Sequence, residues 1–266
     1  MTQTNSKSPV VFVVHDGKSK YLSDVIMSAK LSSNKVFYIG DQIISDNLLP
    51  KDQVIRPDFN NTSLLNEFTK VWKHLMSDNK RSNFEFGCFK RHFLVLEAAS
   101  RLKLYDFWII DSDFLVLENL SIITEYLKKK KFEGALSSPK SEDQYFMASS
   151  PHCSYWNIHS LKEFIIFTIN QYKNDSDALI KKYSYHKDRE LQGGVCDMTL
   201  LYLWKNQTQR KICNSVELVN FGLLIDHNIN FPCDFYELGD FHYNSKDNVN
   251  KNKLSIVMES FLGIKK

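Results

Sequence analysis

The stretch Phe107-Trp108-Ile109-Ile110-Asp111-Ser112-Asp113-Phe114-Leu115-Val116-Leu117 decides the fold. Its apolar run is typical of a strand buried on both faces, as in the centre of a parallel sheet. Side chains two residues apart in an extended chain point the same way, so Asp111 and Asp113 are expected to share a face. Two carboxylates that close repel each other, and an unpaired buried charge is costly. The pattern therefore predicts a cation between them.

A hard divalent ion, Mg²⁺ or Mn²⁺, takes oxygen ligands and keeps positions open for phosphate. The alternative is that one Asp starts a turn and the other caps the helix that follows Asn119. For an isolated Asp-x-Asp that alternative would be the better explanation. The buried strand that precedes the pair here favours the metal site.

Composition sets the outer limits. The chain has 266 residues, 43% hydrophobic and 24% charged, which is ordinary globular composition for one large domain or two small ones. A net charge of +3 is too small to argue for nucleic-acid binding. The five Cys are an odd number without a Cys-x-x-Cys pair, which argues against a disulfide framework and a structural zinc site.

Residues 1–8 are polar and are expected to form a disordered tail. They contain no apolar signal core, and no apolar run reaches the roughly eighteen residues of a membrane span. We therefore expect a soluble protein in the reducing cytoplasm.

The first half alternates strands and helices. Strands are predicted at 10–15 and 35–41 with a helix at 21–31 between them, the beginning of a doubly wound α/β sheet. Ligands of such sheets bind beyond the carboxyl ends of the strands. Five polar residues should lie along that edge: His15, Asp16, Asp41, Asp111 and Asp113. No Gly-x-Gly-x-x-Gly or P-loop motif follows the first strand, so phosphates would have to be held in another way, with a metal as the obvious one.

Further elements follow from apolar periodicity. Helices are predicted at 62–77, 86–103, 119–131 and 161–172, and in a segment that ends near Trp204. Strands are predicted at 133–137, 153–157, 216–220 and 223–226.

Three polar residues in these segments have both an ordinary and a functional interpretation. Arg91 is either a solvated arginine or a phosphate contact. Asp197, after Gly193-Gly194, lies in the first turn of a helix, where a carboxylate is favourable simply because of the helix dipole. His242 lies in a predicted polar loop, and a histidine in such a loop is usually a surface residue. A neutral imidazole at this position would, however, suit Mn²⁺.

This order of elements resembles the GT-A class of nucleotide-sugar glycosyltransferases, in particular glycosyltransferase family 8 and related capsule-type enzymes. Two motifs carry the resemblance beside the Asp111-Ser112-Asp113 triplet. Gly193-Gly194-Val195-Cys196-Asp197-Met198-Thr199 is similar to the family's acceptor-side acidic motif, and Phe241-His242-Tyr243-Asn244-Ser245-Lys246 to its C-terminal His-x-x-x-Lys segment. The chain departs from the family where Asn244 or Ser245 replaces the usual Gly.

The resemblance implies a Rossmann-like, mixed and mostly parallel sheet flanked by helices in a single domain over 9–266. Residues 9–117 would bind the donor nucleotide, and 118–266 would supply the acceptor pocket and the C-terminal metal and phosphate segment.

The implied site has three parts. The Mn²⁺ (or Mg²⁺) ligands would be Asp111, Asp113 and His242. The donor contacts would be Arg91 and Lys246 at the phosphates, His15 and Asp16 at the nucleoside, and Ser112 within the motif. Asp197 would lie by the donor sugar or the acceptor hydroxyl as the catalytic residue.

The implied activity is transfer of a sugar, with retention, from a UDP-sugar to a glycan or other hydroxyl acceptor in polysaccharide biosynthesis. Peripheral membrane contact and the oligomeric state stay open. Two rivals remain. A haloacid-dehalogenase-like phosphatase also ends an apolar strand in Asp-x-Asp, but its motif lies in the first strand and continues with Gly-Thr rather than Phe114-Leu115. A protein of the same fold that binds glycans without turnover is the other.

Overall fold

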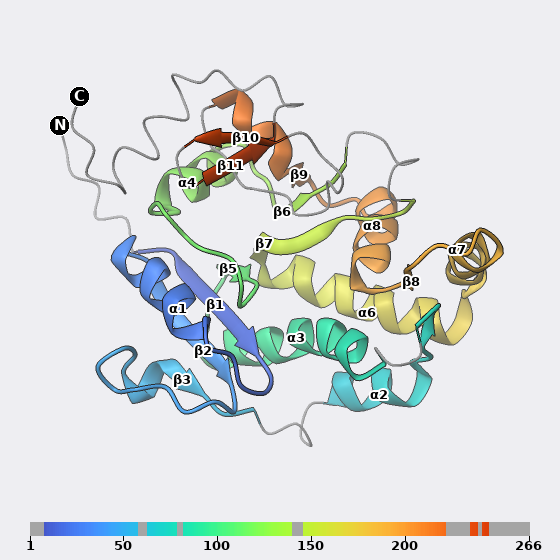
Figure 1. The fold of residues 1–266 in the computed structure, drawn as a ribbon, viewed down its shortest axis with the longest axis horizontal. Helices are drawn as coiled ribbons and strands as arrows, with labels where there is room; N and C mark the ends of the chain where they lie inside the picture. Colours follow the sequence, from blue (N-terminus) through green and yellow to red (C-terminus); the bar gives the residue numbers. More distant parts are fainter. Residues whose placement is uncertain are drawn as a thin grey trace.

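The chain is described here from a computed structural model, which covers residues 8–57, 63–78, 82–139, 146–221, 235–238 and 241–244. Its centre is a seven-stranded sheet in the order β3-β2-β1-β5-β7-β6-β9 (Figure 1). The strands are β1 (Val10–His15), β2 (Lys35–Gly40), β3 (Val54–Ile55), β5 (Asp106–Ile110), β6 (Gly134–Ser137), β7 (Ser150–Asn157) and β9 (Ile212–Asn214). Both halves of the chain contribute strands to this one sheet.

The sheet is mixed and mostly parallel. The four strands β3, β2, β1 and β5 run parallel, and β6 runs parallel to β9. Strand β7 is antiparallel to both of its neighbours. The predicted α/β fold class is therefore confirmed. Because β7 is reversed, its first residues lie at the same edge as the carboxyl end of β5, where the amide of Asp111 donates to the carbonyl oxygen of His152 at 2.8 Å.

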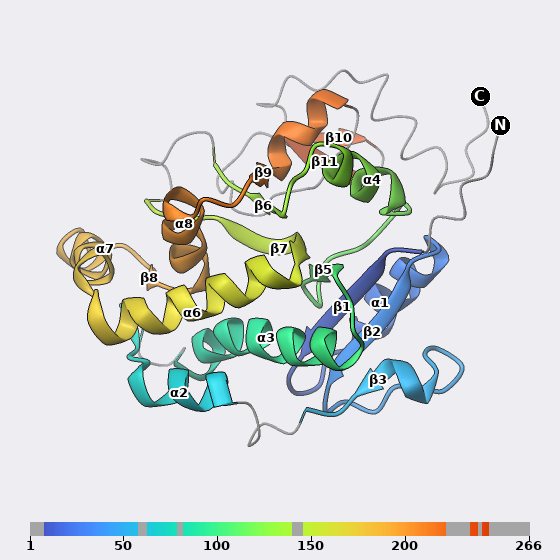
Figure 2. The ribbon, with the colours of Figure 1, turned by 180° about the vertical axis from the view of Figure 1, so that it is seen from behind.

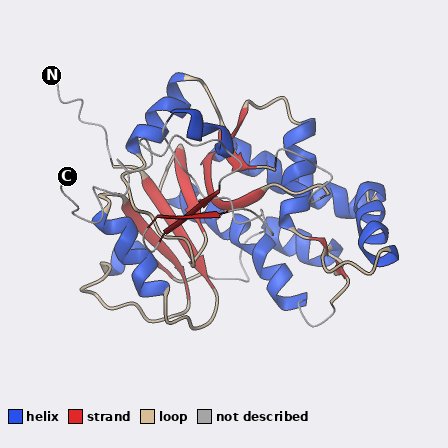
Figure 3. Cartoon of the chain, turned by 45° about the horizontal axis from the view of Figure 1, so that its top comes forward, coloured by secondary structure: helices blue, strands red, loops and turns tan. Residues whose placement is uncertain are grey.

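Helices cover both faces of the sheet (Figures 1, 2 and 3). On one face lie α2 (Ser63–Val71), α3 (Ser82–Arg101), α6 (Ile158–Asn174) and α8 (Asp197–Gln207), whose apolar residues form a core with Phe107 and Ile109. On the other face α1 (Leu22–Leu31) and α4 (Ser121–Lys129) pack with Trp108 and Ile110. Successive residues of β5 thus enter opposite cores, as a strand buried on both faces requires.

Several predicted elements differ in the structure. The strand that begins the 107–117 stretch ends at Ile110. The helix predicted over 62–77 ends at Val71, because β4 (Leu75–Met76) pairs with β8 (Gly194–Val195) and this long-range pairing overrides the helical periodicity. Helix α7 (Asp177–Asp188), which packs against β8 and β4, was not predicted.

The strand pair predicted at 216–220 and 223–226 is wrong in its first member. Residues 215–221 form the 3₁₀ helix η3 (Ser215–Phe221), and residues 223–226 lie outside the described part. The polar loop predicted around His242 is also wrong, since β11 (Phe241–Asn244) pairs antiparallel with β10 (Phe235–Leu238). A further 3₁₀ turn is η1 (Lys51–Gln53). No helix within the described residues is long and apolar enough to cross a membrane.

Candidate functional site

The two acids of the Asp-x-Asp motif lie in a turn at the carboxyl edge of the sheet. The chain leaves β5 at Ile110, and the amide of Phe114 donates to the carbonyl oxygen of Asp111 at 3.1 Å. This hydrogen bond closes a four-residue turn, so the expectation that Asp111 and Asp113 share the face of an extended strand is wrong. Their electrostatic coupling is nonetheless present, because the charge of Asp113 contributes to raising the pKa of Asp111.

Arg91 of α3 is the cation at this edge. Its side chain is 14% exposed, and its two terminal nitrogens contact carboxylates from different elements. Nη1 pairs with Asp111, and Nη2 donates to Oδ2 of Asp197 at 2.6 Å. Burial alone would lower the pKa of Arg91, but the two carboxylates outweigh it and raise the pKa, so the guanidinium is charged. The structure thus brings together three of the predicted site residues.

Asp197 is the most enclosed member of this group. Its side chain is 3% exposed at the start of α8, and it accepts hydrogen bonds from Arg91, from the backbone amide of Met198 at 2.9 Å and from Nε2 of His92 at 3.3 Å. Burial raises the pKa of this carboxyl, but Arg91 and His92 lower it by more, so it stays well below its ordinary value. The carboxylate is therefore ionised, and it is turned toward Arg91 and His92.

His92 is the site residue that the sequence analysis missed. It is buried, with its ring edge-on to Trp156 and Phe164. Burial lowers the pKa of the imidazole, so it is neutral, with its Nε2 proton directed at Asp197. The one signal in the sequence was that His92 directly follows Arg91. A single sequence does not distinguish a histidine that contacts a site carboxylate from an ordinary histidine of the core.

Asp111 is the more open acid, at 24% exposed. Burial raises its pKa, Arg91 opposes this, and the nearby charges of Asp197 and Asp113 raise it further. Arg91 contacts two of the three carboxylates, and Asp113 is close enough to Asp111 to raise its pKa, so among the described residues one guanidinium is set against three acids in this cluster. A divalent cation is the charge that would balance them.

The donor set fits such an ion in part. Among the described residues no group of three His, Cys, Asp or Glu side chains could hold a metal. Mg²⁺ is nevertheless usually bound through one or two carboxylates together with substrate phosphates and water. Asp111 and Asp113 meet that requirement. The third predicted ligand, His242, lies opposite Glu237 in the β10–β11 pair, but its side chain is outside the described residues, as is all of Lys246.

The end of β1 is joined to the same turn. Nδ1 of His15 lies 2.9 Å from Oγ of Ser112. Next to it, Lys90 pairs with Asp16 at 2.8 Å, and the amide of Gly17 donates to Asp41 at 3.0 Å. The five polar residues expected at one edge of the sheet therefore lie at the end of β1 or directly after β1, β2 and β5, as predicted.

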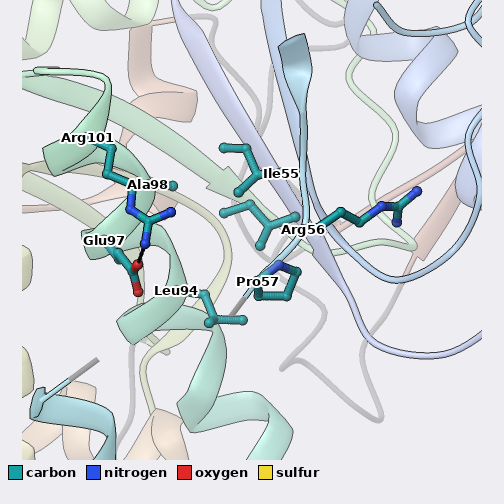
Figure 4. Close-up of a pocket in the computed structure, with 8 residues that line it drawn as sticks. Ile55, Arg56, Pro57, Leu94, Glu97, Ala98 and Arg101 are labelled. Carbon is teal, nitrogen blue, oxygen red and sulfur yellow. Dashed lines mark hydrogen bonds and ion pairs between the residues drawn. The ribbon is translucent and has the colours of Figure 1, made fainter. Parts of the chain in front are cut away.

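A separate shallow pocket lies between the end of β3 and α3 (Figure 4). Arg56, Pro57 and Leu94 line it together with the Glu97–Arg101 ion pair, which spans one turn of α3. None of the predicted site residues lines this pocket. Nη1 of Arg56 donates hydrogen bonds to the carbonyl oxygens of Gly40 and Gln42, at 2.6 Å and 2.9 Å.

No family model and no curated protein sequence matches the chain. Solved structures are similar to it at low identity, three of which are described here in turn. A glycosyltransferase involved in the glycosylation of the major capsid of PBCV-1 is 9% identical over 78% of this chain and 84% of that chain, with a TM-score of 0.40. The glycosyltransferase GlyE of Streptococcus pneumoniae TIGR4 is 14% identical over 82% and 48%, with a TM-score of 0.39. A cytidylyltransferase from Leptospira borgpetersenii serovar Hardjo-bovis is 10% identical over 69% and 72%, with a TM-score of 0.33. Similarities this low carry no argument about function.

Proposed function

We propose that the protein is a metal-dependent glycosyltransferase that moves a sugar from a nucleotide-sugar donor, a UDP-sugar, to a hydroxyl group of a glycan or another acceptor. One observation carries the proposal: the turn that bears Asp111 and Asp113 lies beside the buried Arg91 at the carboxyl edge of an α/β sheet. Carboxylates for a divalent ion and an arginine for phosphate oxygens are the two groups that a nucleoside diphosphate needs.

The chemistry of the reaction suits these groups. When a glycosyl–phosphate bond breaks, negative charge develops on the leaving diphosphate and positive charge on the sugar. A divalent ion held by Asp111 and Asp113, with His242 as the third proposed ligand, would supply Lewis-acid stabilisation of the leaving group. Arg91 and Lys246 are proposed to contact the phosphates as fixed charges. His15, Asp16 and Ser112 would then line the nucleoside side.

The burial of Asp197 refines its proposed role. Its carboxylate is directed at Arg91 and His92 in this structure, so we assign it the positioning of the guanidinium at the donor's diphosphate rather than proton transfer. A carboxylate whose pKa is held this low is a poor general base. Retention of the sugar's configuration is carried over from the resemblance to family 8 alone.

Calorimetric titration of the protein with UDP- and GDP-sugars in the presence of Mn²⁺, followed by a donor-hydrolysis assay, tests the proposal. Asp111→Asn and Asp113→Asn should each abolish transfer and weaken metal-dependent donor binding. Asp106→Asn is the matched control, since Asp106 lies at the other end of β5 in an ion pair with Lys128 and should leave both unchanged.

Each rival predicts a different result. Hydrolysis of p-nitrophenyl phosphate without donor turnover would indicate a phosphatase. Glycan binding without donor hydrolysis would indicate a non-catalytic protein of this fold. Manganese-dependent turnover retained in Asp111→Asn would refute the metal site.

A further inference from the structure

Arg91 joins two carboxylates whose surroundings are unlike. Asp197 is almost fully enclosed and accepts three hydrogen bonds, one of them from the backbone amide of Met198 in the first turn of α8. Asp111 is eight times more exposed, at 24% against 3%, and sits in a turn that faces the open edge of the sheet. The contact between Arg91 and Asp197 is therefore held in place by its buried surroundings. The contact between Arg91 and the more exposed Asp111 can be replaced by another ligand.

The guanidinium is also incompletely satisfied. Both terminal nitrogens are paired, but the buried Nε–H of Arg91 has no hydrogen-bond partner among the described residues. A buried donor without a partner is destabilising, because the group has lost its hydrogen bonds to water without gaining others. A position of Arg91 in which a further acceptor bonds its Nε–H would therefore be more stable than the one seen here.

We propose that Arg91 is a latch that occupies Asp111 when the site is empty and moves to the donor's diphosphate when metal and donor bind, while its contact with Asp197 is kept. This inference rests on the proposed function, because it concerns the same carboxylates and the same donor. The physical reason is competition: a divalent ion on Asp111 and a guanidinium on the same carboxylate repel each other. The diphosphate then offers the displaced nitrogen a new anionic partner.

The latch adds to the coupling that direct contact between the metal ion and the diphosphate already supplies. Mn²⁺ alone must displace Arg91 from Asp111 without compensation, so it binds weakly. A nucleoside diphosphate that arrives with Mn²⁺ accepts the released guanidinium, so each ligand tightens the other by the same factor. Free Mn²⁺ therefore does not fill the site, and the metal enters together with its nucleotide.

Titration of the full chain with Mn²⁺ alone, and with Mn²⁺ plus UDP, followed by the electron paramagnetic resonance signal of free Mn²⁺, measures this coupling without any turnover. In the wild type we expect UDP to tighten Mn²⁺ binding by about tenfold or more. In Arg91→Met we expect Mn²⁺ alone to bind about tenfold more tightly than to the wild type, and UDP to tighten Mn²⁺ binding by a smaller factor than in the wild type. Adding Asp111→Asn to Arg91→Met should remove the gain.

Two further variants serve as a control and as an alternative substitution of Arg91. Arg101→Met removes an exposed charge from the same helix and should leave Mn²⁺ binding unchanged. Arg91→Lys covers the case in which Arg91→Met does not fold, because a single ammonium can pair with Asp197 but cannot fork to both acids. It should bind Mn²⁺ alone more tightly than the wild type, by a smaller factor.

The outcomes separate the latch from the function. If wild type binds Mn²⁺ with UDP but neither Arg91 variant binds Mn²⁺ alone more tightly, the latch is refuted and the glycosyltransferase proposal stands. If no Mn²⁺ binds to the wild type even with UDP, both are overturned.

Discussion

Nδ1 of His15 and the hydroxyl of Ser112 lie 2.9 Å apart, and this contact connects turns that are 97 residues apart in the chain. It fixes the Asp-x-Asp turn against the end of β1.

We expect His15→Ala and Ser112→Ala each to weaken Mn²⁺–UDP binding by about three- to tenfold, because the turn loses the hydrogen bond that holds it in place. The double variant should show a coupling energy of about 1 kcal/mol in a calorimetric double-mutant cycle. Strict additivity would mean that the contact does not position the site. Ser100→Ala, which removes a hydrogen bond within α3, is the control.

Asp197→Asn is expected to abolish turnover while donor affinity is largely kept. It should also lower the free energy of unfolding at pH 7 by about 3 kcal/mol, because the buried Arg91 loses a charged partner. The pKa of Asp197 is lowered in the fold, so its contribution is present above the unfolded value of about 3.9 and is lost as the pH falls through the lower folded value. Denaturant titrations of both proteins should therefore converge in strong acid. Unchanged activity and stability would return Asp197 to a helix-dipole role.

Lys182→Met should stabilise the protein at pH 7. Lys182 is 3% exposed, and its ammonium donates to the carbonyl oxygen of Met147 at 2.8 Å. Lys182 belongs to none of the ion pairs among the described residues. Burial lowers the pKa of Lys182 from 10.5 to about 8, so keeping the buried ammonium charged at pH 7 costs roughly 3 kcal/mol of stability. Lys182→Met removes this cost but also loses the hydrogen bond to Met147, which is worth about 1 kcal/mol.

The pH dependence checks the sign of this effect. Between about pH 8 and pH 10.4 the unfolded chain keeps the proton on Lys182 and the folded chain does not. The free energy of unfolding of the wild type should therefore rise with pH across this window relative to Lys182→Met. A stability difference that does not change from pH 7 to pH 10 would contradict the lowered pKa.

Gly194→Ala should destabilise the protein, and Gly87→Ala should not. Gly194 has φ +146°, and a Cβ there would lie 2.3 Å from the carbonyl oxygen of Leu75, so both the backbone and the β4–β8 pairing must shift. We expect a loss of more than about 2 kcal/mol in the free energy of unfolding. Gly87 lies within α3 with open space at its Cβ, so Ala there should add about 0.5–1 kcal/mol through helix propensity. Thermal unfolding of the pair measures both.

The long apolar strands could be predicted because their signal is local. The runs at β1 and β5 carry buried apolar residues on consecutive positions, and this pattern needs no knowledge of the rest of the chain. The same argument placed His15, Asp41 and Asp111 at one edge, since parallel strands end together. Strands of two residues such as β4 and β8 have no comparable signal, because a tertiary partner alone makes them strands.

The arrangement of the site could be predicted less well. Arg91 and Asp197 were singled out, but their mutual contact joins residues 106 apart, and no local pattern encodes it. The structure places Arg91 beside Asp111, and the metal ion expected between Asp111 and Asp113 stays a prediction. His92 was missed because its function depends on the direction of one ring nitrogen. The share of Asp113, His242 and Lys246 in metal and phosphate binding stays a prediction.

The bridge from Arg91 to Asp111 and Asp197 also bears on how the protein is made. Its three members come from α3, from the turn after β5 and from α8. A growing polypeptide that does not yet include α8 therefore has Arg91 and Asp111 without Asp197. Competence to handle the donor should consequently appear late in synthesis, and truncated products should be inert rather than partly active.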